Sequence, residues 1–436
     1  MESEITHISS NYFDTNKFQK QIDIIKSASE EAQTKIDYYT AHDDDILYAV
    51  SIIEKFLKRA HRLCYGGQAI NAYLPAKYKF YNPEYAIPDY DFFTASQYKD
   101  TVEIVNDLSR AGFSEVSVRE GMHEGTVKIY VNFVPIADLT VIDSSLYRTL
   151  SKRETRIDGI SYLDANTLRM LMYLELSRPR GEVKRWTKVF ERLMLFNEFV
   201  PVKLCKPFHS QPHNKLMPEQ IEYTLKYIIQ NKRVFAGADL LPFYDNAFKT
   251  GTTKINWILY SNKPIIFFSD DSLNDANHLI AEFAKDSFTI KHYSSNGVDL
   301  LPSMKVIQHG KIPLIFIIDV TACHSYINIP IRKAHYGKVM RIASMDTLIT
   351  LYFCFGLMNN KYFDIGSMEC LANQLIQLSM KTRTKGDKTI FPFISLKCYG
   401  HQTTLPSLIR SKIERITLRR KLKISDKKYN RTIYKR

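Results

Sequence analysis

Asp89 and Asp91 are separated by one residue within an apolar segment, residues 87–93. Side chains alternate between the two faces of a β-strand, so both carboxylates point to one face if this segment is a strand. Two carboxylates with overlapping reach suit one or two hard divalent cations. A solvated turn is the alternative for an isolated Asp-x-Asp pair, so the flanking segments decide between the two.

A pair of glycines precedes these aspartates. Gly66 and Gly67 end a short apolar strand, and a pattern with helical spacing restarts at Gln68. Glycine lets the backbone approach an anion closely, and the free N–H groups that open a helix favour negative charge. The order of strand, glycine pair and helix predicts a phosphate site, with a plain tight turn as the alternative.

A third aspartate, Asp138, lies inside an apolar and β-branched segment, residues 127–143. A carboxylate within such a strand carries a desolvation cost that a metal or a cationic partner would offset. Capping of a turn is the alternative, and it fits Asp143 better because two serines follow that residue. Asp138 is therefore the third candidate ligand.

The glycine pair, the Asp-x-Asp motif and the later strand aspartate together resemble the polymerase β type of nucleotidyltransferase. The strings Tyr65–Asn71 and Pro88–Phe93 are most similar to poly(A) polymerase catalytic subunits of large cytoplasmic DNA viruses, including poxviruses, asfarviruses and giant viruses. The resemblance implies template-independent addition of AMP from ATP to the 3′ end of mRNA. It also implies that Asp89, Asp91 and Asp138 are catalytic and bind two Mg²⁺ or Mn²⁺ ions.

Two features depart from the general pattern of that superfamily. The interval from Gly67 to Asp89 is longer than usual, which predicts an insertion around residues 75–83. Gln68 stands where many members place Ser or Thr, so backbone N–H groups are expected to hold the triphosphate without a hydroxyl.

Cations for a triphosphate are expected on a helix that includes residues 184–193. Arg185 and Lys188 are three residues apart and share a helix face. We predict nucleotide binding by these two residues together with Gly66, Gly67 and Gln68. A solvated helix face that binds nothing is the alternative.

Composition describes a globular chain with a basic balance. A length of 436 residues predicts two or three domains, and the formal net charge is +14. The six cysteines are dispersed without a C-x-x-C motif, so neither a zinc site nor a disulfide framework is expected, as in a reducing compartment. The longest apolar runs, near residues 312–320 and 348–358, are too short to span a bilayer, and no secretory leader is expected.

The C-terminal segment carries most of the excess charge. From Arg410 to Arg436 there are twelve Lys or Arg residues against two acids, a net of +10. Cations with interleaved tyrosines suit a phosphodiester backbone and its bases. A solvated terminus and a membrane-surface helix are the alternatives. The candidate RNA-binding residues share the predicted amphipathic helix and are Arg415, Arg419, Arg420, Lys421 and Lys423.

The second half of the chain repeats the first in outline. The four matched pairs are Val234–Leu240 with Cys64–Ile70, Pro264–Ser269 with Asp89–Thr94, Ile312–Asp319 with Val134–Asp138, and Ala343–Leu348 with Tyr162–Leu168. In these pairs Pro264, Ile266 and Phe316 replace the three aspartates, and Ala236 replaces one glycine. Phe363 and Gly366 likewise replace the two helix cations. The second copy has thus lost its ligands.

The predicted fold is α/β (α+β), with tandem nucleotidyltransferase-like modules. Each module is a mixed β-sheet flanked by helices, and the second is degenerate. The expected divisions are a helical segment 1–45, a catalytic domain 46–200, a linker 201–233, a degenerate domain 234–380 and a basic segment 381–436.

Other functions and partners remain open at this point. A catalytically inactive RNA-binding scaffold is one alternative, and a nucleotidyltransferase acting on tRNA or a small molecule is another. The expected partners are an RNA 3′ end and ATP, without a membrane, and the resemblance leaves a homodimer or a viral processivity subunit open. It also implies a cytoplasmic viral factory as the location, with packaging in the virion as the alternative.

Overall fold

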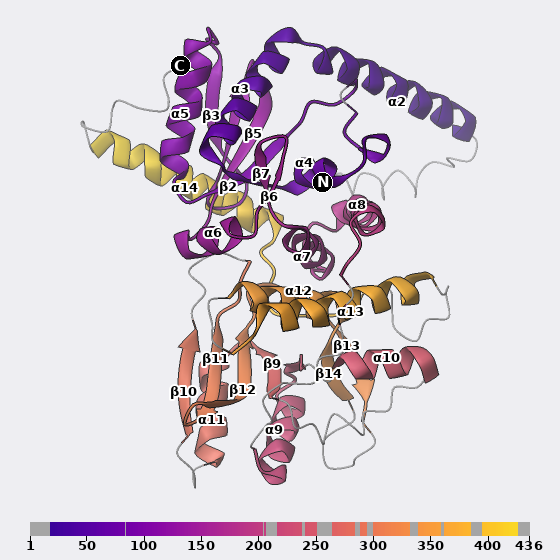
Figure 1. Ribbon diagram of the computed structural model, residues 1–436, viewed down its shortest axis with the longest axis vertical. Coiled ribbons are helices and arrows are strands. Elements are labelled where there is room, and N and C mark those ends of the chain that lie inside the picture. Colours follow the sequence, from indigo (N-terminus) through magenta and orange to yellow (C-terminus); the bar gives the residue numbers. More distant parts are fainter. Residues whose placement is uncertain are drawn as a thin grey trace.

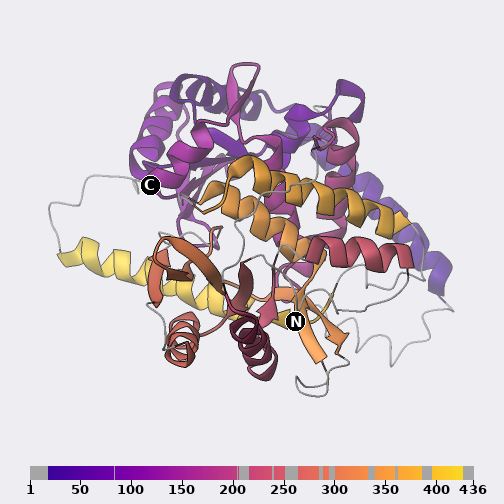
Figure 2. The same cartoon turned by 60° about the horizontal axis from the view of Figure 1, so that its bottom comes forward.

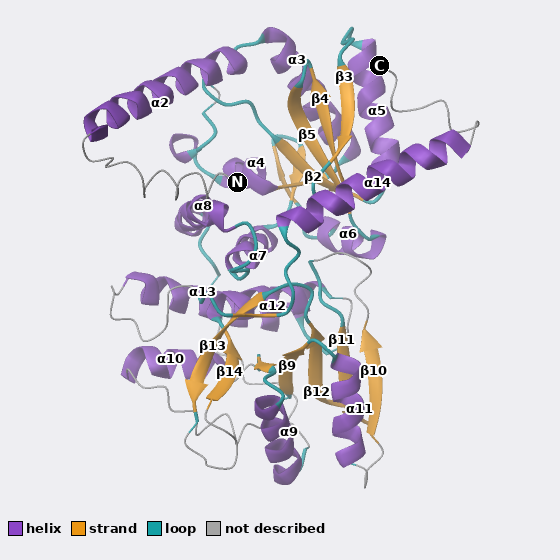
Figure 3. Ribbon diagram, turned by 180° about the vertical axis from the view of Figure 1, so that it is seen from behind, coloured by secondary structure: helices purple, strands orange, loops and turns teal. Residues whose placement is uncertain are grey.

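The structure is a computed structural model of the 436-residue chain. It describes residues 18–82, 84–203, 205, 216–237, 240–250, 264–283, 288–293, 300–331, 339–358, 362–384 and 395–425. Two mixed sheets lie at opposite ends of the molecule with a layer of helices between them (Figures 1 and 3).

The N-terminal half builds the first sheet and the helices around it. Its elements are α2 (Gln19–Ala41), α3 (Asp44–Ala60), β1 (Leu63–Tyr65), α4 (Gly66–Tyr73), η2 (Ala76–Tyr78), β2 (Tyr90–Thr94), α5 (Gln97–Arg110), β3 (Val116–Glu120), β4 (Thr126–Val131), β5 (Val134–Val141), α6 (Ser144–Ser151), β6 (Thr155–Ile157), β7 (Ile160–Tyr162), α7 (Ala165–Leu176), η3 (Val183–Arg185) and α8 (Trp186–Phe199).

The C-terminal half builds the second sheet and ends in a long helix. Its elements are α9 (Pro218–Gln230), β8 (Val234–Phe235), α10 (Leu240–Thr250), β9 (Ile265–Ser269), α11 (Ser272–Glu282), β10 (Phe288–Tyr293), β11 (Met304–His309), β12 (Ile312–Asp319), β13 (His324–Pro330), β14 (Val339–Ala343), α12 (Met345–Leu357), α13 (Ile365–Thr384), β15 (Cys398–Tyr399) and α14 (Leu405–Ser425).

The two sheets share one topology. The first has the strand order β3-β4-β5-β2-β1-β7-β6, and the second has β10-β11-β12-β9-β8-β14-β13-β15. Along the first seven strands of each sheet, the parallel and antiparallel pairings follow the same order in both sheets. Even the register shift recurs, where Tyr130 faces Pro135 and where Gln308 faces Pro313. The prediction of tandem mixed-sheet modules is confirmed.

The register corrects one of the four sequence pairings. Tyr65 is opposite Asp91 in the first sheet, whereas the Ala236 N–H donates to the Ile266 carbonyl, 2.8 Å away, in the second. Ala236 therefore takes the place of Tyr65, and Gly237 takes that of Gly66. The expectation that Ala236 replaces a glycine is wrong by one residue, because a short strand can slide by one position without disturbing its apolar pattern.

Helix α3 shows how local signals set the frame of the first sheet. The Asp43 carboxylate caps the helix by accepting from the Ile46 N–H at 3.0 Å, as expected for an acidic N-cap. Ile46, Ile53 and Phe56 lie on a stripe that is buried against the sheet. The helix ends at His61, which adopts a left-handed conformation.

The two halves contact each other through helices and polar pairs. Helices α7 and α12 pack together between the sheets (Figures 1 and 3), and the Cys354 sulfur lies 3.7 Å from that of Met170. Arg153 joins Asp164 of its own half, at 3.1 Å, to Glu369 of the other half. Helices α2 and α14 extend from opposite sides of the molecule (Figures 1 and 2).

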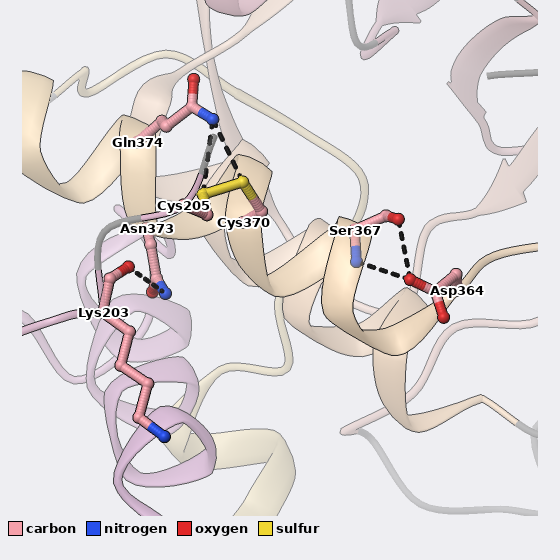
Figure 4. The surroundings of a disulfide bond; sticks show 7 residues. All are labelled: Lys203, Cys205, Asp364, Ser367, Cys370, Asn373 and Gln374. Carbon is pink, nitrogen blue, oxygen red and sulfur yellow. Dashed lines mark hydrogen bonds between the residues drawn. A yellow bond between two sulfur atoms is a disulfide. The ribbon is translucent and has the colours of Figure 1, made fainter. Parts of the chain in front are cut away.

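Two disulfides correct the expectation that none would form. Cys205 pairs with Cys370, with Cα atoms 5.8 Å apart, and Cys323 pairs with Cys398 at 5.3 Å. Figure 4 shows the first bond, which joins the segment after α8 to α13. The Gln374 side-chain amide lies beside both sulfurs. The partners are 165 and 75 residues apart in sequence, so only the fold brings them together. Across the described part of the chain, no helix is long and apolar enough to cross a membrane.

Candidate active site

Two neighbouring parallel strands, β2 and β5, carry the candidate ligands Asp91 and Asp138, and β1 lies beside them. Tyr65 on β1, Asp91 on β2 and Asp138 on β5 are in register across the first sheet. Asp89 lies two residues before Asp91, just ahead of β2, so its side chain faces the same side. The structure therefore brings Asp89, Asp91 and Asp138 together on one face of the sheet, at β2 and β5.

The carboxylates affect one another strongly. Burial raises the pKa of Asp91 to about 7, and the negative charges of Asp89 and Asp138 add to the rise. Asp89 is exposed at the rim of the site, yet the protein around its carboxyl and the charge on Asp138 raise its pKa as well. These aspartates are held close together against their mutual repulsion, which a bound cation would relieve.

Asp138 is the most enclosed of the three aspartates, with 8% of its surface exposed. One carboxylate oxygen accepts from the Lys128 ammonium, and the other has no hydrogen-bond partner among the described residues. Lys128 is on β4, directly opposite Asp138. Burial alone would lower the pKa of Lys128, but the hydrogen bond and charge of Asp138 raise it overall. Lys128 is absent from the sequence-based candidates, and cross-strand pairing is the signal that would have identified it.

The donor set fits a hard divalent cation. Within the described ranges, no three His, Cys, Asp or Glu side chains are grouped closely enough to hold a metal as they stand. Carboxylate oxygens are nonetheless the ligands that Mg²⁺ and Mn²⁺ prefer, and Asp138 has a buried oxygen without a partner. In this structure the Lys128 ammonium supplies positive charge to the same carboxylate.

Gly66 allows the backbone to pass the carboxylate of Asp91. Its φ is +73°, and a Cβ at this position would collide with the Asp91 side chain. Helix α4 begins at Gly66, and its N-cap residue Tyr65 makes no side-chain capping bond, so the first N–H groups can meet an anion. Gln68 follows in the first turn, half-buried, with a side-chain oxygen that has no hydrogen-bond partner in the described structure.

Arg185 at the end of η3 and Lys188 in the first turn of α8 bring cations to the edge of this site. The charge on Arg185 opposes the rise in the pKa of Asp91, and Lys188 opposes that of Asp89. Both cations are exposed, and Arg185 also pairs with Glu175 at 3.3 Å. Burial lowers the pKa of Lys188, and the positive neighbours Arg192 and Arg185 lower it further.

Arg192 is a further cation that the sequence-based candidates omit. Its guanidinium carbon is 4.3 Å from the centre of the Phe80 ring, and it donates to the Tyr81 hydroxyl at 3.2 Å. A Cβ on Gly67 would lie 2.7 Å from an Arg192 nitrogen, so this cation stands at the start of α4. Phe80 and Tyr81 belong to the segment predicted as an insertion, which here positions the arginine. The spacing of four residues from Lys188 was the available signal.

The basic helix α14 lies beside the first sheet. The Arg415 guanidinium donates to the Met122 carbonyl, at 3.3 Å, in the connection between β3 and β4. Arg420 is exposed. Arg419, Lys421 and Lys423 lie on the helix, but their side chains are outside the described residues, as is the chain after Ser425. The predicted RNA contacts therefore remain predictions, with Arg415 held in a protein contact.

Known proteins share both the motif region and the fold. A family model described as "Poly(A) polymerase catalytic subunit" matches residues 51–182. A mimivirus relative of that description is 29% identical over 238 residues, which cover 51% of this chain and 38% of the relative. A relative from an African swine fever virus isolate is 27% identical over 179 residues, 40% of this chain and 38% of its own. The chain thus spans under half of the length of these relatives.

The fold has a solved counterpart. The crystal structure of the Megavirus polyadenylate synthase superposes with a TM-score of 0.70 at 17% identity, covering 94% of this chain and 84% of that one. This match extends the similarity in fold across both sheets. The matched segment, residues 51–182, contains the glycine pair and all three aspartates. This segment is therefore similar to poly(A) polymerase catalytic subunits, as its motifs indicated.

Proposed function

We propose that this protein is a polynucleotide adenylyltransferase that adds AMP from ATP to the 3′ end of mRNA without a template. The observation that carries the proposal is the placement of Asp91 beside Asp138, in register on parallel strands, with Gly66 and the start of α4 against Asp91. Carboxylates that would bind cations thus adjoin a helix N-terminus that would bind an anion, an arrangement that nucleotidyl transfer requires. The names of the relatives support the same activity.

Asp89, Asp91 and Asp138 would hold two Mg²⁺ or Mn²⁺ ions. When bound, such ions make a 3′-hydroxyl more nucleophilic and neutralise charge that develops on the α-phosphate. The rigid strands β2 and β5 fix the carboxylates before any ligand arrives. Because Asp91 and Asp138 are largely removed from solvent, water screens their charges weakly, and their attraction for a bound cation would be strong.

The triphosphate would lie between α4 and α8. The free N–H groups after Gly66 would receive phosphate oxygens, and Arg185, Lys188 and Arg192 would add positive charge from the facing helix. Gln68 offers a side-chain amide in place of a hydroxyl. Phe80 and Tyr81 already orient the Arg192 guanidinium, so its side chain would lose less conformational entropy on binding a phosphate.

RNA would approach along the basic helix α14. This helix contacts the connection between β3 and β4 through Arg415, next to His123, which lies 3.5 Å from Glu182. Glu182 in turn pairs with Arg185, at 3.2 Å, so the helix adjoins the proposed nucleotide site. The cations of α14 would bind the phosphodiester backbone independently of sequence.

Primer extension tests the proposal. The purified protein is incubated with an end-labelled RNA and each of the four nucleoside triphosphates in turn, with Mg²⁺ or Mn²⁺. The expected result is long products from ATP alone with the wild type and none with the Asp89→Asn/Asp91→Asn variant, which should keep its circular dichroism and RNA affinity. Extension by the variant, or extension with every nucleotide equally, would reject the assignment.

A further inference from the structure

Lys128 and Asp138 face each other at the centre of the first sheet, and apolar residues stand at the two corresponding positions of the second sheet. Lys128 on β4 is opposite Asp138 on β5, and the ammonium contacts the carboxylate. At the corresponding position of the second sheet, Val306 on β11 is opposite Phe316 on β12. At these two corresponding positions the carboxylate and the lysine are thus present together in one module and absent together in the other.

The burial of this pair explains why the aspartate needs a partner. Asp138 is almost fully enclosed, and one of its oxygens has no hydrogen bond among the described residues. An isolated buried carboxylate is strongly unfavourable, and the neighbouring charges of Asp89 and Asp91 make it more so. The Lys128 ammonium is the contact that offsets this cost in a protein without a bound cation.

Lys128 is also able to leave. Its side chain is 35% exposed, against 11% for that of Asp138. A lysine has a flexible four-carbon stem and a strongly hydrated head, so its ammonium can turn to solvent at modest cost. A divalent cation at the carboxylates would repel the ammonium and compete for the same Asp138 oxygen.

We propose that Lys128 is the internal counter-ion of the site, which neutralises Asp138 while no divalent cation is bound and withdraws when one binds. The proposal rests on the proposed function for the identity of the cation site. Lys128 is a positioning residue in this account. It keeps the aspartates in place in the cation-free protein, and it weakens cation binding because it must be displaced.

The test uses the full chain with Lys128→Met and a matched control, Lys305→Met. Lys305 is on β11 of the second sheet and pairs with Asp319 at 3.2 Å, away from the three aspartates. Mn²⁺ affinity is measured by titration calorimetry, and Tm is measured in EDTA and in Mn²⁺. No substrate is added, so both readouts are independent of activity.

The expected results differ between the two variants. K128M should have a lower Tm than the wild type in EDTA. It should bind Mn²⁺ on the order of tenfold more tightly, so adding Mn²⁺ should raise its Tm by more than that of the wild type. K305M should lower Tm equally with and without Mn²⁺ and leave the affinity unchanged. Lys128→Arg should keep the Tm in EDTA, since it retains the charge.

Two results would overturn the proposal in distinguishable ways. Equal or weaker Mn²⁺ binding by K128M, with a wild type that binds Mn²⁺ and an Asp138→Asn variant that does not, would reject the counter-ion and keep the proposed function. Absence of Mn²⁺ binding in both the wild type and K128M would reject the cation site itself, and the counter-ion with it.

Discussion

The first and second sheets have the same strand order and directions but differ at their centres. Where the first places Asp91 beside Asp138, the second places Ile266 beside Phe316. Phe316 is 1% exposed and packs against the ring of Phe363, with ring centres 4.8 Å apart. The fold therefore forms without central carboxylates, so the aspartates of the first sheet are carried for another purpose.

A second set of acids is shared by both modules. Asp100 accepts from Arg62 at 2.7 Å and from the hydroxyl of Thr94. Asp275 likewise accepts from Arg233 at 2.8 Å and from the hydroxyl of a strand serine at 2.6 Å. Each is at most 1% exposed. A buried carboxylate that recurs on α5 and α11 with its partners satisfied is expected to serve the fold, whereas one present in a single module and left partly unpaired is a candidate for chemistry.

The largest expected effect separates these two kinds of acid. Asp100→Asn should lower the free energy of unfolding by about 3–5 kcal/mol, because it leaves the partly buried Arg62 without its acidic partner. Asp275→Asn should lower it by less, because Arg233 keeps its ion pair with Asp270. Asp91→Asn should not lower it in cation-free buffer, since it removes repulsion among the aspartates. Urea unfolding measures all three. A loss with Asp91→Asn equal to that of the other two would erase the distinction.

An aromatic pair in the second sheet contains a histidine where the first sheet has a tyrosine. Phe93 stacks on Tyr65 in the first sheet, whereas the corresponding Phe268 stacks on His324 at 5.4 Å. Burial, with a smaller effect from the charge of Arg178, lowers the pKa of His324 from 6.5 to about 3. The unfolded chain therefore binds the proton first, so this contribution to stability is present above pH 6.5 and is lost as pH falls toward 3.

We expect His324→Phe to remove about 2 kcal/mol of the stability loss between pH 7 and pH 5. Urea unfolding of the wild type and variant across this range measures the difference. A matched Tyr65→Phe variant in the first sheet should leave the pH profile unchanged. Parallel profiles of unfolding free energy against pH for the wild type and H324F would show that His324 does not cause the loss of stability at low pH.

Arg192 tests whether the helix beside the first sheet serves the nucleotide. The sequence alignment of α8 with α13 places Arg192 against Cys370, which is bound in a disulfide. Arg192→Met should lower kcat/KM for ATP about tenfold, the value of one charge-assisted phosphate contact, with little change in RNA affinity. Steady-state extension at varied ATP measures it. A fall in RNA affinity with KM for ATP unchanged would assign Arg192 to RNA instead.

The smallest expected effect concerns the basic helix. Arg420→Gln on α14 should weaken RNA binding about two- to threefold at moderate salt and reduce the slope of log affinity against log salt by nearly one. Lys291→Gln, on the exposed edge strand β10, is the matched control and should change neither. Fluorescence anisotropy with a labelled RNA measures both. Equal effects from the two variants would mean that RNA binding depends on the overall charge of the protein and not on α14.

Local patterns predicted the parts of this molecule that depend on neighbouring residues. Alternation of apolar residues predicted the strand around Asp91, and the glycine pair predicted the helix after Gly66. The internal repeat predicted the apolar counterpart at Phe316. The disulfides and the pairing of Lys128 with Asp138 could not, because they join residues that the fold alone brings together. The one-residue error at Ala236 has the same origin, since register is set across strands.

The most direct test of the account compares chemistry at the two sheet centres in one assay. Extension of a labelled RNA with ATP is measured for the wild type, for Asp91→Asn, and for Ile266→Val/Phe316→Leu at the corresponding positions of the second sheet. The account predicts a loss of at least about 10³-fold with D91N and a rate near that of the wild type for the second-sheet variant. Activity in D91N, or its loss in a folded second-sheet variant, would contradict the assignment of catalysis to the first sheet alone.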